Sequence, residues 1–155
     1  MEATMLQVAA SFTALVNGGA YYQPTIIDGE MKDGEYVPRT DIAPVASGII
    51  KESTSETVRK VLVDARRAGF PGADRAGYDV GGKTGTSQVI KNGAYSTTET
   101  IGSYAGFGGG DRPEYVIMVQ VAGENKELQG ARDALPIFTD ISNWMIEYLK
   151  IQPKG

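Results

Sequence analysis

The chain has 155 residues with 15 basic and 19 acidic side chains, and its net charge of −4 at pH 7 disfavours a nucleic-acid partner. It contains neither cysteine nor histidine, which excludes thiol nucleophiles, disulfide bonds, a Ser-His-Asp triad and most zinc sites. Hydrophobic residues make up 41% without any run near the roughly 18 residues of a membrane span, so we expect one soluble globular domain with no metal or organic cofactor.

The N-terminal segment predicts a helix followed by a β-hairpin. Thr4 and Gln7 are placed as a capping box, and Asn17-Gly18-Gly19 supplies a C-terminal stop. The apolar stripe between them is Met5, Val8, Ala9, Phe12, Leu15 and Val16. Residues 25–37 contain two apolar pairs around Asp33-Gly34, which predicts a hairpin. Its acidic residues lack the spacing of a calcium-binding loop and are expected to be solvated: Asp28, Glu30, Asp33 and Glu35.

Two more helices are predicted downstream. Ser53 and Glu56 are placed to cap the first of them, which ends near Gly69. The second has Pro136 in its first turn, where a backbone donor is not needed. In both helices, apolar residues three and four apart are expected to face the core. They are Val58, Val61, Leu62 and Ala65 in one, and Ala134, Ile137, Ile141, Trp144, Met145, Tyr148 and Leu149 in the other.

Three strands are predicted between these helices. The residues after Lys83 have β preference, and Ser103–Phe107 precede a glycine-rich turn. The continuous apolar run Tyr115–Val121 suits a strand that is covered on both faces. The order helix, hairpin, helix, three strands, helix indicates an α+β fold in which helices flank an antiparallel β-sheet meander.

The stretch Gly77–Val89, GYDVGGKTGTSQV, fits two motifs. It satisfies G-x-x-x-x-G-K-[ST], the phosphate-binding loop of nucleotide hydrolases. Such a loop needs a buried strand before it and a helix after it. Here the segment before the motif is rich in glycine and proline, and Lys83-Thr84 is followed by Gly85 and then by residues that prefer β structure. Lys83-Thr84-Gly85 is also a short motif of penicillin-reactive serine acyltransferases. The simplest alternative is an edge strand whose glycines only permit close packing.

The order of motifs around Lys83 resembles the C-terminal part of the transpeptidase domain of class B penicillin-binding proteins, which has a serine β-lactamase-like fold. The stretch MLQVAASFTALVNGGAYYQPTI resembles a family helix that ends at Asn-Gly-Gly. GGKTGTSQ resembles the family strand G-K-T-G-T-[AS]-Q, and SYAGFG resembles the strand that follows it. The resemblance covers about residues 4–150, so residues 1–155 are expected to form a single partial domain.

The resemblance implies a D,D-transpeptidase that crosslinks peptidoglycan by serine acyl transfer. In such enzymes S-x-x-K, S-x-N and K-T-G meet in one cleft. Lys83 would raise the local positive potential and attract the substrate carboxylate. Thr84 and Thr86 hydroxyls would bind this carboxylate, Gly85 would leave room for it, and the Thr86 N–H would contribute to the oxyanion hole. Lys83 and Thr86 are thus the expected catalytic residues, and Lys83, Thr84, Gly85 and Thr86 the expected substrate-binding residues.

Both other motifs are missing from this chain. None of its eight serines has a lysine three residues later or an asparagine two residues later: Ser11, Ser47, Ser53, Ser55, Ser87, Ser96, Ser103 and Ser142. In the family these motifs precede the region matched here. We therefore expect a C-terminal fragment, a product of a split or cleaved protein, or a truncated form, without covalent catalysis of its own.

Three hypotheses follow. A partial transpeptidase domain is favoured over a non-catalytic binding or sensor module of the same fold, and nucleotide binding comes last. The expected partners are a peptidoglycan stem peptide or a β-lactam, and the missing N-terminal half of the domain or a second copy along Tyr115–Val121. The parent protein is expected at the extracytoplasmic face of the bacterial cytoplasmic membrane, held by an anchor absent from this chain.

Overall fold

A computed structural model describes residues 3–154. The elements follow the predicted order: α1 (Met5–Val16), β1 (Gly29–Lys32), β2 (Glu35–Pro38), α2 (Glu52–Gly69), β3 (Asp79–Lys91), β4 (Ala94–Gly109), β5 (Pro113–Val121), a π-helical turn η1 (Gly130–Ala134) and α3 (Leu135–Tyr148). The α+β fold with an antiparallel meander is confirmed. Among the described helices, none has the length and apolar character needed to cross a membrane.

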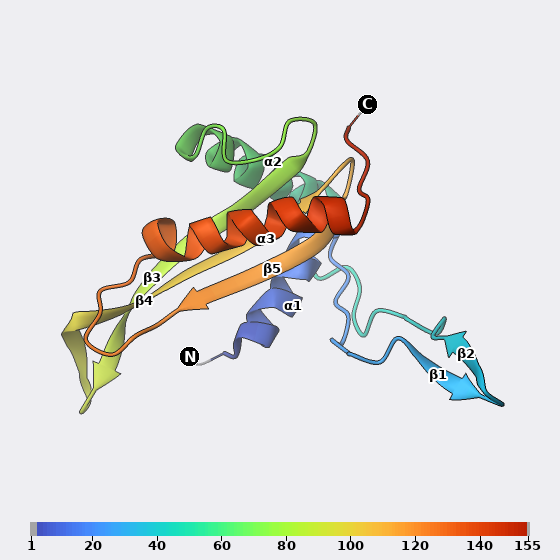
Figure 1. Cartoon of the computed structure of the whole chain (residues 1–155), viewed down its shortest axis with the longest axis horizontal. Coiled ribbons are helices and arrows are strands. Elements are labelled where there is room, and N and C mark those ends of the chain that lie inside the picture. Colours follow the sequence, from blue (N-terminus) through green and yellow to red (C-terminus); the bar gives the residue numbers. More distant parts are fainter. Residues whose placement is uncertain (1–2, 155) are drawn as a thin grey trace.

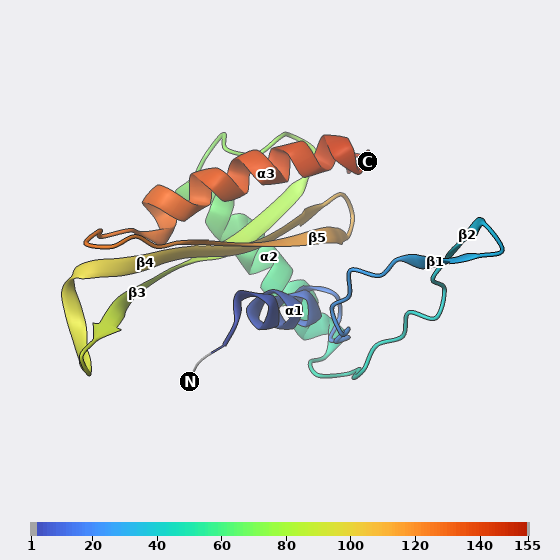
Figure 2. The same cartoon turned by 60° about the horizontal axis from the view of Figure 1, so that its bottom comes forward.

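The central sheet has the strand order β3-β4-β5, and both pairs are antiparallel. α3 covers one face of this sheet, whereas α1 and most of α2 lie on the other face (Figures 1 and 2). Within residues 3–154, β3 and β5 each pair only with β4. The sheet therefore has two open edges, one along β3 and one along β5.

Each face of the sheet has its own hydrophobic core. Under α3, Tyr104 of β4 and Val119 of β5 pack against Phe138. On the other face, Phe107 of β4 packs against Val16 of α1 and Val63 of α2. Since successive residues of a strand point to opposite faces, Tyr104 and Phe107 anchor β4 to the two layers separately.

The N-terminal helix begins and ends where the sequence predicts. The Thr4 side chain accepts from the Gln7 N–H, and the Gln7 side chain accepts from the Thr4 N–H, which confirms the capping box. The stripe prediction is only partly right, because Met5 is exposed and the residues buried most completely are Ala10, Ala14 and Val16. Small side chains on this side allow α1 to approach the sheet closely.

Helix α2 differs from its prediction at both the cap and the buried face. Its N-cap is Lys51 without a side-chain cap bond, so the predicted Ser53 cap is wrong. Val61 is exposed, whereas Ser55 and Arg66 are almost fully buried. Ser55 is tolerated because its hydroxyl donates to the Leu15 carbonyl at 2.8 Å and accepts from the Gly18 N–H at 3.0 Å. Hydrophobic spacing cannot predict a buried face that polar contacts stabilise.

Helix α3 also turns a different side to the sheet from the predicted one. Its buried residues are Leu135, Phe138, Ser142 and Ile146. The residues of the predicted inner stripe that remain exposed include Ile137, Ile141, Trp144 and Tyr148. Ser142 fits the interior because its hydroxyl lies 2.7 Å from the Tyr115 hydroxyl. The prediction failed because both sides of this helix are apolar, and spacing alone cannot rank them.

The β1–β2 hairpin projects from the body of the molecule (Figure 1). Asp33 and Gly34 form its turn, both with positive φ as a two-residue hairpin loop requires. The chain returns to the body where Tyr21 and Ala46 form an isolated β-bridge. The hairpin prediction is confirmed, although the paired strands begin at Gly29 rather than at residue 25.

Candidate functional site

The predicted site lies on the open edge of β3. Lys83, Thr84, Gly85 and Thr86 occupy the middle of this strand, opposite Ala105, Tyr104, Ser103 and Gly102 of β4. Lys83 and Thr86 are exposed, and Thr84 and Gly85 are half-buried. The Lys83 Nζ donates to the Thr84 carbonyl at 2.9 Å and contacts the Thr84 Oγ1 at 3.3 Å. A cation and a hydroxyl therefore meet at the rim of the sheet.

Backbone groups of the same stretch are directed to solvent. Because the Thr84 carbonyl accepts from a lysine side chain, it faces away from β4. Antiparallel pairing alternates along a strand, so the N–H and C=O of Thr86 also face the open edge, and those of Gly85 face β4. An extended peptide could pair with Thr84 and Thr86 along this edge.

The Thr86 side chain is held from the α3 side of the sheet. Its Oγ1 accepts from the Gly130 N–H of η1 at 3.2 Å. A hydroxyl has one proton and two lone pairs, so this bond leaves the Thr86 proton free for a further acceptor. Reasoning from the sequence assigned no role to Gly130, and its position just before the closing helix was the only available signal.

Close packing explains the glycines that surround the site. A Cβ at Gly82 would lie 2.5 Å from the Tyr104 ring, and one at Gly85 would lie 2.5 Å from the Ser103 Oγ. A Cβ at Gly130 would lie 2.5 Å from the Gly85 carbonyl oxygen. These distances are shorter than real side chains allow, so the backbone of β3 is pressed against β4 and η1.

The same geometry contradicts nucleotide binding by a phosphate loop. Such a loop needs Lys83 and Thr84 in a turn that leads into a helix. Both residues instead lie inside the continuous strand Asp79–Lys91, which leads into β4. The match to the nucleotide motif is therefore a coincidence of glycines.

The far end of the β3–β4 hairpin is tied to the chain that follows β5. The Glu99 carboxylate accepts from the Lys91 ammonium of β3 and from the Asn125 N–H at 2.6 Å. The Lys91 hydrogen bond, assisted by the Asn125 N–H, holds the pKa of Glu99 below its usual range. This tie keeps the connection between β5 and η1 close to the strand that carries Thr86.

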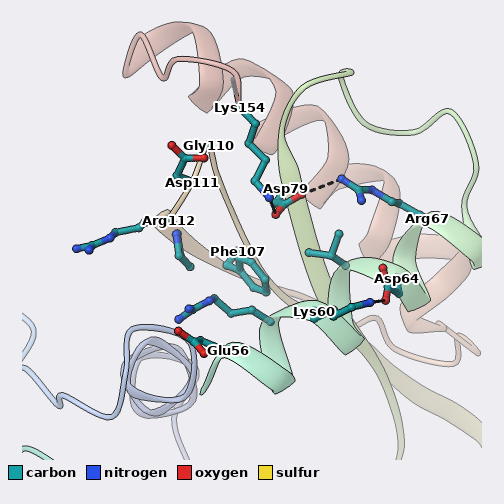
Figure 3. A pocket seen from close by; sticks show the side chains of 13 residues that line it. Glu56, Lys60, Asp64, Arg67, Asp79, Phe107, Gly110, Asp111, Arg112 and Lys154 are labelled. Carbon is teal, nitrogen blue, oxygen red and sulfur yellow. Dashed lines mark hydrogen bonds and ion pairs between the residues drawn. The ribbon is translucent and has the colours of Figure 1, made fainter. Parts of the chain in front are cut away.

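A cavity of about 420 Å³ lies at the other end of β3, between α2, the β4–β5 turn and the C-terminal segment (Figure 3). Its floor includes Phe107, and charged side chains of both signs surround it. Asp79 pairs with Arg67 at 2.8 Å and with Lys154, and Lys60 pairs with Asp64. Because these charges compensate one another, we regard this cavity as a structural feature of the surface.

Known proteins are similar to this chain in sequence and in fold. The family described as "Penicillin binding protein transpeptidase domain" matches residues 1–143. The chain is 28% identical over 160 residues to the probable peptidoglycan D,D-transpeptidase PenA of Neisseria flavescens, covering 99% of this chain and 36% of the relative. It is 32% identical over 157 residues to stage V sporulation protein D of Bacillus subtilis, covering 99% of this chain and 24% of the relative.

The fold has a solved counterpart in penicillin binding protein 3 of Mycobacterium tuberculosis in complex with ampicillin. The TM-score is 0.78 at 26% identity, and the match covers 99% of this chain and 36% of that chain. The chain thus spans between a quarter and just over a third of the length of these proteins.

Proposed function

Because this chain belongs to the penicillin-binding protein transpeptidase family, we propose that it forms the carboxylate-binding wall of a peptidoglycan D,D-transpeptidase. The substrate would be the D-Ala-D-Ala end of a stem peptide, or a β-lactam that imitates it. The reaction is acyl transfer through a serine, at the extracytoplasmic face of the bacterial cytoplasmic membrane. The relatives' names and the complex with ampicillin support this substrate class.

The observation that carries the proposal is the open edge of β3. Lys83 Nζ and Thr84 Oγ1 meet there at 3.3 Å, beside backbone groups that β4 does not use. A cation with a neighbouring hydroxyl suits a carboxylate, because charge-assisted hydrogen bonds are about twice as strong as neutral ones. The free proton of the Thr86 hydroxyl adds a second donor on the same strand.

Lys83 and Thr86 have different roles in this scheme. The Lys83 ammonium attracts the carboxylate and favours the deprotonated form of a nearby serine or lysine. The Thr86 N–H faces the edge and would donate to the oxyanion that forms when the serine attacks. Gly85 would leave room for the substrate, and the Ser103 hydroxyl already occupies the place that a side chain at Gly85 would take.

The nucleophile must come from another segment, because no serine of this chain begins S-x-x-K or S-x-N. We propose that the chain acts as the C-terminal portion of a transpeptidase domain and that S-x-x-K approaches the β3 edge from a preceding segment or a separate chain. A non-catalytic binding module of the same fold is the competing proposal. It would bind the carboxylate without any such partner.

The test is labelling with a fluorescent penicillin. We expect no covalent adduct on the chain alone, because the nucleophile is absent. The chain is then co-expressed with the preceding part of a relative's transpeptidase domain, ending where the similarity to this chain begins. We expect this complemented domain to form an adduct that survives denaturation, with the label on the S-x-x-K segment.

Two controls make the result decisive. The S-x-x-K segment alone, and the complemented domain with its nucleophilic serine changed to alanine, should both stay unlabelled. Stoichiometric labelling of the isolated chain would contradict the assignment of a missing nucleophile. Penicillin binding without labelling by a stable complemented domain would favour the binding module.

A further inference from the structure

Arg66 is the most deeply buried charged residue within residues 3–154, with 1% of its surface exposed. Its guanidinium makes two hydrogen bonds to the Asp74 carboxylate, each 2.7 Å long. It also donates to the Tyr104 hydroxyl at 3.0 Å and to the Thr139 hydroxyl at 2.9 Å. The cation lies 5.4 Å from the centre of the Tyr104 ring and 5.0 Å from that of Phe138. We call these residues the Arg66 cluster.

The cluster lies where α2 passes the open edge of β3. Val63 of α2 packs against Phe107 on the α1 side of the sheet. One helical turn later, Arg66 contacts Tyr104 and Thr139, which belong to the α3 side. Immediately before Val63, the Leu62 backbone approaches β3, where a Cβ at Gly81 would lie 3.1 Å from it. α2 therefore covers the edge of β3 up to Gly81, and the open stretch begins close to Lys83.

Tyr104 connects the Arg66 cluster to the site on β3. It is the residue opposite Thr84 in the β3–β4 pairing. Its ring also lies against Gly82, where a Cβ would come within 2.5 Å of the ring carbon Cε1. The ring therefore packs directly against the backbone that carries Lys83 and Thr84. Arg66 fixes the outer end of that ring through its hydroxyl.

Stability alone is a weak reason for such an arrangement. A buried ion pair costs desolvation energy, and replacing it by well-packed apolar residues is often neutral or stabilising. A guanidinium instead fixes the relative orientation of its partners, because its donors lie in one plane and reach several acceptors at once. Burial raises the pKa of the Tyr104 hydroxyl, so this group stays neutral and can accept from Arg66 across the physiological range.

We propose that Arg66 is a positioning residue, which acts through Tyr104 to set the placement of Lys83 and Thr84 for carboxylate binding. This inference rests on the proposed function. Arg66 does not touch the substrate. It determines where α2 stops covering β3, near Gly81, and how firmly Lys83 and Thr84 are held.

The first test uses the isolated chain and does not depend on catalysis. Tyr104→Phe removes the hydroxyl that Arg66 contacts and keeps the ring, and Arg66→Lys removes the fork and keeps the charge. The amides of Lys83 and Gly85 face β4, and in both variants we expect them to exchange with solvent about tenfold faster. Arg67→Lys is the matched control, because Arg67 pairs with Asp79 on the surface. Unchanged exchange at both amides in a folded Tyr104→Phe variant would overturn the inference.

The second test uses the complemented domain and two β-lactams, one with a free carboxylate and one with this group methylated. Penicillin concentration series separate the apparent dissociation constant from the limiting acylation rate. For Tyr104→Phe and Arg66→Lys we expect an apparent dissociation constant raised about tenfold and a weaker preference for the free carboxylate, with Arg67→Lys unchanged. If Arg66 and Tyr104 served only to stabilise the fold, both variants would lower the fraction of protein that can be labelled and leave the apparent dissociation constant unchanged.

The outcomes separate this inference from the function on which it rests. If the unaltered complemented domain is not labelled, the proposed function fails and the inference fails with it. If it is labelled and both variants keep its dissociation constant and carboxylate preference, only the role of Arg66 is wrong.

Discussion

The two open edges of the three-stranded sheet, β3 and β5, differ in the residues that they present. Along the β3 edge, three of the five positions from Gly81 to Gly85 are glycine. The other two are Lys83 and Thr84, and Thr86 follows Gly85. After Pro113 and Glu114, the β5 edge is a run of apolar residues from Tyr115 to Val121, interrupted only by Gln120. One edge is polar and open, and the other is apolar and lacks charge.

The difference shows how one sheet can separate recognition from assembly. An edge that binds a peptide reversibly needs exposed backbone groups together with charged or polar side chains that oppose permanent pairing. The β3 edge has both, and its end is closed by α2 near Gly81. The β5 edge has the backbone groups without the protection, so it suits a permanent partner strand. Changes at the two edges should therefore have different consequences.

The largest effect is expected at Lys83. In the complemented domain, Lys83→Ala should reduce the acylation efficiency by about 10²–10³-fold, as loss of one transition-state contact typically does. The fold should be retained, because Lys83 is exposed and the hydrogen bonds that its side chain makes within residues 3–154 go only to the neighbouring Thr84. Stopped-flow labelling with fluorescent penicillin measures the rate, and thermal unfolding measures the stability.

Two neighbours of Lys83 provide the comparison. Thr86→Val should weaken binding of the carboxylate and leave the Gly130 N–H without its acceptor. Ser87→Ala should weaken carboxylate binding less than Thr86→Val, because the Ser87 and Thr86 side chains point to opposite faces of β3. If all three variants were acylated as fast as the unaltered domain, the site would be wrongly assigned and the two edges would not differ in function.

Gly130→Ala should have the next largest effect. It should lower the stability and alter the structure at the β3 edge but not at the β5 edge. The new methyl group would lie 2.4 Å from the Ser103 carbonyl oxygen and 2.5 Å from that of Gly85. Overpacking of this kind costs about 1–3 kcal/mol in the free energy of unfolding. Urea unfolding measures the loss, and amide chemical shifts should change around Gly85 and Thr86 and stay constant along β5.

A matched control is available in the same region. Gly123→Ala places its methyl group only against flexible atoms of Lys126 and Leu128, the nearest at 3.1 Å. It should cost much less than Gly130→Ala. Similar losses in both variants would indicate a general sensitivity of this connection rather than contact with β3.

The order of elements and the extended conformation around Lys83 could be predicted from the sequence because they depend on local signals. The Thr4–Gln7 capping box, the Asp33-Gly34 turn and the apolar run of β5 each act within a few residues. The short motif at Lys83 marked a strand that is indeed an open edge. Its proposed chemistry still awaits the labelling experiments.

The faces of α2 and α3 could not be predicted, because they depend on contacts between distant segments. Ser55 is buried because it bonds to Leu15, 40 residues earlier. Arg66 is buried because it bonds to Asp74, to Tyr104 and to Thr139, which lies 73 residues later. A pattern of apolar residues contains no information about such partners, so the predicted buried face included neither Ser55 nor Arg66.

The smallest effect is expected from a single charge on the β5 edge. The open edge predicts that the chain associates with itself along β5, because neither charge nor proline in Tyr115–Val121 opposes strand pairing. Val119 is unsuitable for testing this, since it is buried against α3 and a lysine there would disrupt the core. Gln120 is exposed, and the register of β5 directs its backbone groups away from β4.

Gln120→Lys should therefore reduce association without reducing stability. Light scattering over a concentration series should show a lower average mass for Gln120→Lys than for the unaltered chain, by less than twofold if dimers dominate. Thr97→Lys, an exposed change on β4, is the control for charge alone and should leave the average mass unchanged. Co-expression with the preceding transpeptidase segment should also abolish the association, if that segment supplies the missing strand. A monodisperse monomer whose Met118 and Gln120 amides are protected from exchange would mean that the β5 edge is already covered, and the contrast between the two edges would then be one of composition only.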